Sequence, residues 1–337
     1  MIKIDGSEGE GGGQVLRTSA SLSLVTGQPF RIENIRGKRE KQGLMRQHVT
    51  SLEAACAISE SECDGLAVGS SEINFRPGSV KSGNYKFAVG TAGSTNLVLQ
   101  TILPALVFAD DPSHIILEGG THNLMAPPFD FIERAFLPII NRMGPTISAK
   151  LIRHGFYPQG GGRIEIDINP APLQRIECLD RGKLCSTSGT AYFAGLPYEI
   201  ASREVKAASK ILGWEDGAIG VRQLPEDQGP GNILILEAAF ENVSEVVSGF
   251  GKLGLKAERL AKTAANRMKG YLASKAFAGP YLADQLLLPF ALSGGGAFTT
   301  VKPSQHSLTS ADIVEKFTGR KSSFDQQENG EFLVQIG

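Results

Sequence analysis

The sequence lacks three features that would assign it to a specialised class of protein. Its 34 basic and 35 acidic side chains give a net charge of −1, so any nucleic-acid contact must come from a local patch. None of the four cysteines belongs to a CxxC pair, which predicts buried or incidental thiols in a reducing compartment. No apolar run approaches the roughly 20 residues that span a bilayer, and no export signal opens the chain, so we expect a cytoplasmic protein.

Glycine is abundant, with 40 residues, and it falls in clusters between short strand-like runs and amphipathic helices. The order of strand, glycine-rich turn and buried helix occurs near the start, again before the helix expected over 94–108, and again over 280–292. In each helix two leucines stand six residues apart: Leu16 and Leu22, Leu97 and Leu103, Leu286 and Leu292. Two interpretations stay open, namely repeated α+β units that cover one another's sheets, or coincidence within apolar helices.

A domain boundary is predicted near Arg181-Gly182. A turn-rich stretch over 169–172 ends the preceding strand pattern, and the residues from about 185 to 276 show strands and helices of their own, including a long helix over 256–272. From Pro280 the glycine-punctuated style resumes. The sequence therefore predicts a large domain made of residues 1–181 and 277–337, with a small inserted domain over 182–276.

The segment from Gly6 to Gln14 contains five glycines in nine residues. Glycine lets backbone N–H groups approach an anion closely, and a helix beginning near Gln14 would direct its positive end at the same place. Arg17 would lie one turn inside that helix. The block matches neither the Walker phosphate loop nor the dinucleotide fingerprint, so an anion cradle and a simple tight turn both stay open.

A basic segment follows at residues 36–48, with five cations and one acid. Arginine forks such as those of Arg36 and Arg39 suit phosphate oxygens, and Gln47 and His48 add polar groups at the head of the next helix. Phosphate or RNA-backbone binding is one interpretation. A solvated basic loop is the other.

His306 lies in a polar turn that we expect to precede a helix over 311–317, capped by Ser307, Thr309 or Ser310. Near a helix start an imidazole is kept neutral, so it could act as a base or a nucleophile, or merely hydrogen-bond the turn.

Three further parts of the sequence are candidates for a site. Gln100 is a polar residue in an apolar helix, and we expect it to have a partner, either a ligand or a buried backbone group. The segment Tyr281–Gln285 begins a helix and could either hold an adenine base or cap that helix. A second glycine block, over 153–162, could line a cleft or form a hairpin.

Together these segments resemble the RNA 3′-terminal phosphate cyclase family. The resemblance runs from about residue 4 to residue 318. The matching pieces are Gly9–Gln14 with Arg17, Arg46–His48, Arg153–Pro158, Asp227–Asn232, Tyr281–Gln285, and His306 before Leu308-Thr309.

The resemblance implies a ligase-type enzyme that uses ATP and a divalent metal, Mg or Mn, to adenylate a histidine. AMP then passes to an RNA 3′-phosphate, and the ribose 2′-OH closes a 2′,3′-cyclic phosphate and expels AMP. ATP and RNA 3′-phosphate ends would be the partners in an RNA-processing reaction, with no membrane involved and the oligomeric state left open. The implied fold is α+β, with three repeated βαβ-type units like the C-terminal domain of translation initiation factor three and a small inserted α/β domain.

The resemblance also implies a role for individual residues. His306 would be the nucleophile, and Glu10 would be a metal-associated acid. The residues implied for ATP binding are Gln100, Pro128, Tyr281, Leu282, Ala283, Asp284, Gln285 and Arg17. The residues implied for the RNA end and its phosphates are Arg36, Arg39, Gln47 and His48.

Two other functions remain as alternatives. A non-catalytic ribosome-assembly relative would lack the histidine nucleophile, whereas this chain has His306 and the Tyr281–Gln285 segment. An enolpyruvyl-transferase-like enzyme would share repeated α+β units but would form no histidine–nucleotide intermediate.

Overall fold

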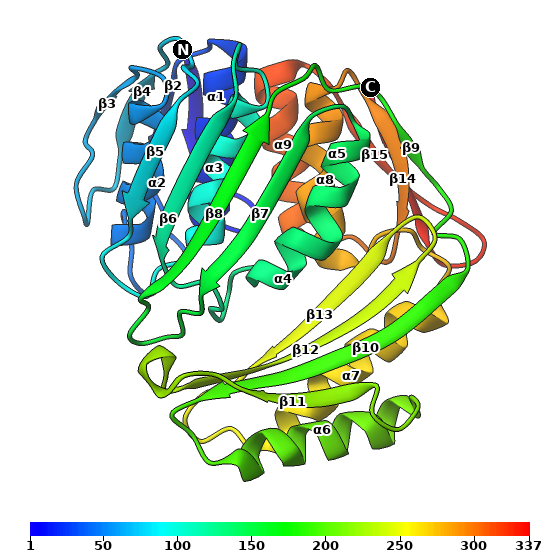
Figure 1. Cartoon of the computed structure of the whole chain (residues 1–337). Helices are drawn as coiled ribbons and strands as arrows, with labels where there is room; N and C mark the ends of the chain where they lie inside the picture. Colours follow the sequence, from blue (N-terminus) through cyan, green and yellow to red (C-terminus); the bar gives the residue numbers. More distant parts are fainter.

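Four mixed four-stranded sheets and the helices that cover them make up the computed structural model, which describes all 337 residues (Figure 1). The first sheet has the strand order β1-β2-β4-β3, and α1 and α2 belong to the same stretch of chain. The bounds of these elements are β1 Ile2–Asp5, α1 Gly13–Thr26, β2 Phe30–Glu33, α2 Arg46–Ala57, β3 Glu62–Asp64 and β4 Ile73–Arg76.

The second sheet has the order β5-β6-β8-β7. Its elements are β5 Asn84–Ala88, α3 Thr95–Leu106, β6 Ser113–Gly119, α4 Phe129–Phe131, a π-helical turn Ile132–Phe136, α5 Leu137–Arg142, β7 Thr146–Arg153 and β8 Gly162–Asn169. The third sheet has the order β15-β16-β14-β9. Its elements are β9 Glu177–Cys178, α8 Pro280–Leu292, β14 Gly296–Thr300, α9 Gln305–Thr318, β15 Ser322–Gln326 and β16 Phe332–Ile336.

These three sheets share one pattern of strand pairing. In each, the first strand runs parallel to the second, the second is antiparallel to the fourth, and the fourth is antiparallel to the third. The helices α1, α3 and α8 lie between the first and second strands of their sheets. They are the three helices whose leucines stand six residues apart in the sequence.

The fourth sheet, β11-β10-β12-β13, is formed by residues that lie between β9 and α8 in the chain. Its elements are β10 Leu184–Ala194, α6 Tyr198–Leu212, β11 Ile219–Gln223, a 3-10 turn Glu226–Gln228, β12 Gly231–Phe240, β13 Ser244–Phe250 and α7 Ala257–Ala273. In Figure 1 this sheet lies below the others, with α6 and α7 on one side of it. It has its own cluster of 14 buried apolar residues, whereas a cluster of 63 joins the three remaining sheets and also includes residues of the fourth, such as Ile233, Ile235 and Val246.

The helices that carry the polar segments pack together at the centre of the molecule. Helix α1 contacts both α3 and α9, and α9 also contacts α8. Side chains from both ends of the chain are therefore brought next to each other.

Most predicted elements are present within a few residues, and the fold is a mixed α+β one. The helix containing His306 is the main correction. It begins at Gln305, six residues before the predicted start, and Ser304 is its cap, because the Ser304 hydroxyl accepts from the Ser307 N–H at 3.0 Å. His306 therefore lies within the first turn of α9. The glycine block over 153–162 connects β7 and β8 as a hairpin. All four cysteines are free, and no helix is long and apolar enough to cross a membrane.

Candidate active site

A cleft of about 770 Å³ opens between α1, α3, α8, α9 and strand β13. This volume is in the range of small-molecule sites. Twelve of the site residues expected from the sequence line it: Glu10, Arg17, Arg36, Arg39, Gln47, His48, Gln100, Pro128, Tyr281, Asp284, Gln285 and His306.

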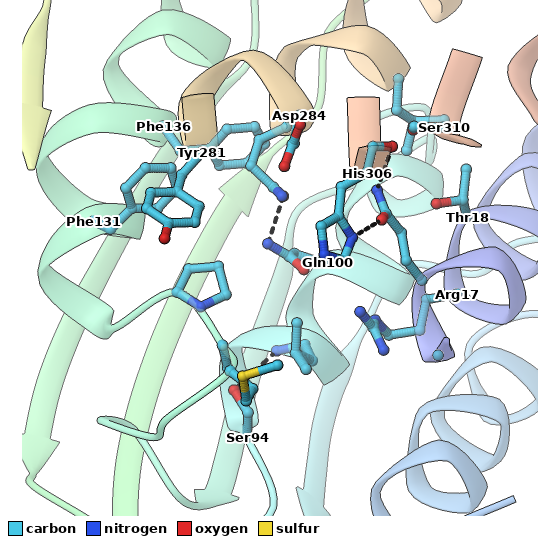
Figure 2. A pocket seen from close by; sticks show the side chains of 18 of the residues that line it. Arg17, Thr18, Ser94, Gln100, Phe131, Phe136, Tyr281, Asp284, His306 and Ser310 are labelled. Atoms are coloured by element: carbon cyan, nitrogen blue, oxygen red, sulfur yellow. Dashed lines mark hydrogen bonds between the residues drawn. The ribbon is translucent and has the colours of Figure 1, made fainter. Parts of the chain in front are cut away.

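The imidazole of His306 has one nitrogen held and the other available. Nδ1 lies 2.5 Å from Oε1 of Gln14, and the Gln14 amide nitrogen donates to the His306 carbonyl at 3.4 Å (Figure 2). Because an amide oxygen can only accept, Nδ1 carries the proton and Nε2 of the neutral ring has a free lone pair. The side chain is 47% exposed, so a ligand in the cleft can reach it.

The surroundings favour the neutral ring. Burial lowers the pKa of His306, and although Asp284 raises it, Arg39 and Arg17 add to the lowering. Nε2 lies 3.8 Å from the carboxylate of Glu10, which lies within the glycine block. The C-terminal imidazole and the N-terminal loop thus form one site.

Gly13 allows the side chains of His48 and Arg17 to converge beside this loop. A Cβ atom at Gly13 would lie 2.3 Å from Nε2 of His48 and 2.9 Å from Nη1 of Arg17, so only glycine fits there. The Met45 N–H donates to Nδ1 of His48 at 3.0 Å, which leaves the Nε2 proton as a donor. Burial, with Arg17 and Arg36 nearby, lowers the pKa of His48 to about 3, so this donor is neutral.

The cations of the cleft are only partly neutralised. Arg39 pairs with Glu10, but Arg17 and Arg36 form no salt bridge, and burial alone lowers their pKa values, that of Arg17 to about 10. A half-buried guanidinium without an acidic partner is costly unless an anion binds there. This end of the cleft is therefore suited to phosphate groups.

Glu10 is the acidic group at this end. Its Oε2 atom is buried and has no hydrogen-bond partner, while its backbone N–H donates to Oγ1 of Thr309 at 2.9 Å. No cluster of three or more histidine, cysteine or acidic side chains suited to a metal occurs in the molecule. A cation beside Glu10 would thus take most of its ligands from groups other than histidine, cysteine or acidic side chains.

The opposite end of the cleft is aromatic. Figure 2 shows Phe131, Phe136 and Tyr281 on one side of Gln100, with His306 and Arg17 on the other. Within the protein, the Gln100 amide donates to Oε1 of Gln285 at 2.5 Å, so its partner is a side chain and not the backbone group that the sequence offered as one alternative. Flat apolar side chains next to hydrogen-bonding amides are suited to a nucleobase with its ribose.

Asp284 connects the two helices that carry these groups. Its carboxylate accepts hydrogen bonds from the hydroxyls of Ser304, at 2.7 Å, and Ser307, so α8 helps to cap α9 just beside His306. Burial raises the pKa of Asp284 although both hydroxyls lower it.

Comparison with known proteins agrees with this arrangement. A family model described as RNA 3′-terminal phosphate cyclase matches residues 8–324. Proteins named RNA 3′-terminal phosphate cyclase from Koribacter versatilis, Ralstonia nicotianae and Ectopseudomonas mendocina are 49%, 48% and 45% identical to the chain. These alignments cover 98%, 94% and 94% of this chain and 93%, 91% and 92% of the relatives. The chain belongs to the RNA 3′-terminal phosphate cyclase family.

Two residues expected at the nucleotide site of this family member do not line the cleft. Leu282 is fully buried and Ala283 is 2% exposed, and both belong to the hydrophobic core beneath Tyr281. Both residues belong to the matching segment Tyr281–Gln285. On a helix, however, their side chains point away from the face that Tyr281, Asp284 and Gln285 share.

Sequence reasoning missed the loop that follows β6, although residues 123–127 line the cleft next to Pro128. A buried hydrogen bond of 2.9 Å between Nε2 of His122 and Asp130 joins the two ends of this loop. Asn96 of α3 also ties the loop, because its amide donates to the carbonyls of Thr121 and Pro127. The isolated His122 gave no sign of this in the sequence, since its partner lies eight residues away on another element.

The fourth sheet also contributes to the cleft, which the sequence did not indicate. Val246, Ser248 and Phe250 of β13 line it, and so does Arg267 of α7. The Arg267 guanidinium lies 5.9 Å from the centre of the Tyr281 ring. The alternation of β13 directs every second side chain toward the cleft.

Proposed function

We propose that the protein converts an RNA 3′-terminal phosphate to a 2′,3′-cyclic phosphodiester in an ATP-dependent reaction that passes through a histidine–AMP intermediate. The observation that supports this most is the neutral Nε2 of His306 facing a cleft with a cationic end and an aromatic end. The relatives that share 45–49% of the sequence are named for this cyclase activity.

In the first step, Nε2 of His306 attacks the α-phosphorus of ATP. An N–P bond forms, the bond from the α-phosphorus to the bridging oxygen breaks, and pyrophosphate leaves with the electron pair. Gln14 holds the proton on Nδ1 throughout, and the positive charge that develops on the ring lies near the carboxylate of Glu10, 3.8 Å from Nε2.

In the second step, an oxygen of the RNA 3′-phosphate attacks the same phosphorus, and the N–P bond breaks to regenerate neutral His306. The terminal 2′-OH then attacks the activated 3′-phosphorus, loses its proton to solvent and expels AMP. Adenylation is needed because a phosphate monoester repels nucleophiles and has a poor leaving group. Arg17, Arg36 and Arg39 with the Nε2 proton of His48 would stabilise the phosphoryl oxygens.

We assign the aromatic end to adenine and ribose, with Tyr281 and Pro128 beside the base and Gln100, Asp284 and Gln285 near the sugar; Leu282 and Ala283 would support this face from beneath. A divalent metal, Mg²⁺ or Mn²⁺, fits beside Glu10, because Oε2 is a buried oxygen ligand without a partner. When bound, such an ion would neutralise charge on the triphosphate. Gln47, whose Oε1 accepts from the Ser94 N–H at 2.7 Å, would orient the loop that meets the RNA end.

We also propose that the three sheets with the shared pairing pattern are copies of one unit that resembles the C-terminal domain of translation initiation factor three. The separate apolar cluster of the fourth sheet supports an inserted domain over 182–276 within a large domain of residues 1–181 and 277–337.

The test uses ATP with RNA oligonucleotides that end in a 3′-phosphate. We expect a product resistant to phosphomonoesterase, because its terminal phosphate is cyclic. A matched oligonucleotide whose last sugar lacks the 2′-OH should stop at the RNA-adenylate. Cyclisation without ATP, or no reaction with either RNA, would contradict the proposal, and failure to form any AMP adduct would favour a non-catalytic role.

A further inference from the structure

A second strongly basic segment of the chain contains helix α7 of the fourth sheet and lies outside the cationic end of the cleft. Residues 252–275 contain seven cationic side chains and one acidic side chain, in a protein whose net charge is −1. All seven cations are exposed, and none forms a salt bridge. The one acid, Glu258, is already paired with Arg203 of α6 at 2.7 Å.

Within α7 three cations gather on one face. Arg259, Lys262 and Lys269 lie three and seven residues apart on the side opposite the buried Ala264 and Met268, whereas Arg267 projects at the border beside the buried Leu260. We call Arg259, Lys262 and Lys269 the α7 basic face. From Arg259 to Lys269 it extends about 15 Å along the helix.

This arrangement is unfavourable for the helix itself. Arg259 and Lys262 are like charges at spacing i, i+3, and Arg259 lies in the first turn of α7, where the helix dipole disfavours cations. By contrast, the exposed face of α9 mixes Asp312, Glu315 and Lys316. A single-sign face that costs helix stability is better explained by an external anion than by solubility.

The α7 basic face is on the same helix as a residue of the cleft. Arg267 lines the cleft and lies 5.9 Å from the Tyr281 ring, and along α7 it stands between Lys262 and Lys269. We propose that the α7 basic face binds the phosphate backbone of the RNA upstream of its 3′ end, so that the fourth sheet holds the strand while the large part of the molecule acts on its terminus. This inference rests on the proposed function, which supplies the RNA end in the cleft.

A single strand is favoured as the occupant. The row of cations is narrow and one helix wide, and its one neighbouring carboxylate, Glu258, is already paired with Arg203, so the repeated cations match a repeated phosphate chain. An acidic protein segment or an anionic membrane surface would offer similar charge, and the test separates them.

The test compares K262Q/K269Q with K206Q/K210Q, a control that removes the same charge from the exposed face of α6 in the same sheet layer. Binding of a 20-nucleotide and a two-nucleotide RNA 3′-phosphate is measured by fluorescence anisotropy, and cyclisation by KM and kcat. We expect K262Q/K269Q to weaken binding of the long RNA about tenfold at 50 mM salt and to leave the short RNA and kcat unchanged. Because each single-strand phosphate contact contributes about 0.7 to the salt slope, this loss should be roughly sevenfold smaller at 200 mM salt.

Substitutions that retain the charge should retain the affinity, so K262R/K269R should bind the long RNA like the native protein. Equal losses on long and short RNA, or an equal loss in K206Q/K210Q, would overturn the proposal. It would also be overturned if K262Q/K269Q lost affinity only for phosphatidylserine vesicles or for a polyglutamate peptide. Anisotropy needs no catalysis, so a protein that binds RNA through α7 but forms no AMP adduct would refute the proposed reaction and leave this inference standing.

Discussion

Nδ1 of His306 lies 2.5 Å from Oε1 of Gln14, although 292 residues separate the two side chains in the sequence. This contact joins the first turn of α9 to the first turn of α1, and it selects the tautomer in which Nε2 is free to react. The glycine block and the C-terminal histidine therefore form one site.

Gln14→Ala should lower the rate of adenylation by about 10- to 100-fold, because the ring loses the acceptor that fixes its orientation and tautomer. The KM for ATP should change little, since the phosphate-binding cations remain. Gln28→Ala is the matched control, because the Gln28 amide also donates to a carbonyl of α9, that of Phe317 at 2.7 Å, but lies outside the cleft. Single-turnover labelling with α-labelled ATP measures the rate, and equal rates for the two variants would contradict the tautomer argument.

Arg17→Met should weaken ATP use and stabilise the empty protein. The guanidinium is partly buried without an acidic partner, and burial lowers its pKa to about 10, so its charge disfavours the folded state without ligand. We expect a gain of about 1 kcal/mol in the free energy of unfolding, measured in urea, together with a raised KM for ATP. A loss of stability would show instead that Arg17 has a structural role.

Gly13→Ala should abolish adenylation and destabilise the protein, because the new methyl group would lie 2.3 Å from Nε2 of His48. The control is Gly270→Ala in α7, where nothing lies within 4 Å of a Cβ and helix propensity predicts a gain of up to about 1 kcal/mol. Thermal unfolding and labelling of both variants check this. Full activity in Gly13→Ala would mean that the loop is not closely packed around its ligand site.

Stability should fall in mild acid partly because of His48. Its folded-state pKa of about 3 is below the unfolded value of about 6.5, so the stabilisation is complete above pH 6.5 and is lost as the pH falls toward 3. Between pH 6.5 and pH 5 the protonation of His48 should lower the free energy of unfolding by about 2 kcal/mol. His154, whose pKa burial lowers to about 4, acts in the same direction, so His48→Gln should retain about half of the dependence. Urea unfolding at both pH values measures it, and an unchanged pH dependence in the variant would place His48 in contact with water.

Periodicity and punctuation predicted most elements, because apolar residues at helical or alternating spacing specify buried faces wherever the partners lie. Contacts between residues on different elements could not be predicted in the same way. The predicted start of α9 was wrong because the cap of this helix, Ser304, is stabilised by Asp284 of another helix. Such a contact has no local signal in the sequence. The contribution of β13 and Arg267 to the cleft depends on how the fourth sheet packs against the others, and no local pattern encodes that packing.

The role of the separate residues of the site came from the family resemblance, and the structure adds the reason for their types. Gly13 is small because His48 and Arg17 converge on it, and Gln100 is polar because Gln285 faces it. Neither relation could be inferred from spacing, since each joins residues on different helices.

The central claim is that Nε2 of His306 accepts AMP, and the most direct measurement is the mass of the intact protein after incubation with ATP. We predict a single adduct of the mass of AMP that acid removes and base does not, that peptide mapping places on His306, and that His306→Ala lacks while unfolding at the same temperature as the native protein. Burial lowers the pKa of His306, so the adduct should form at full rate at pH 7. An adduct that persists in His306→Ala, or a native protein that gains no mass, would contradict the account.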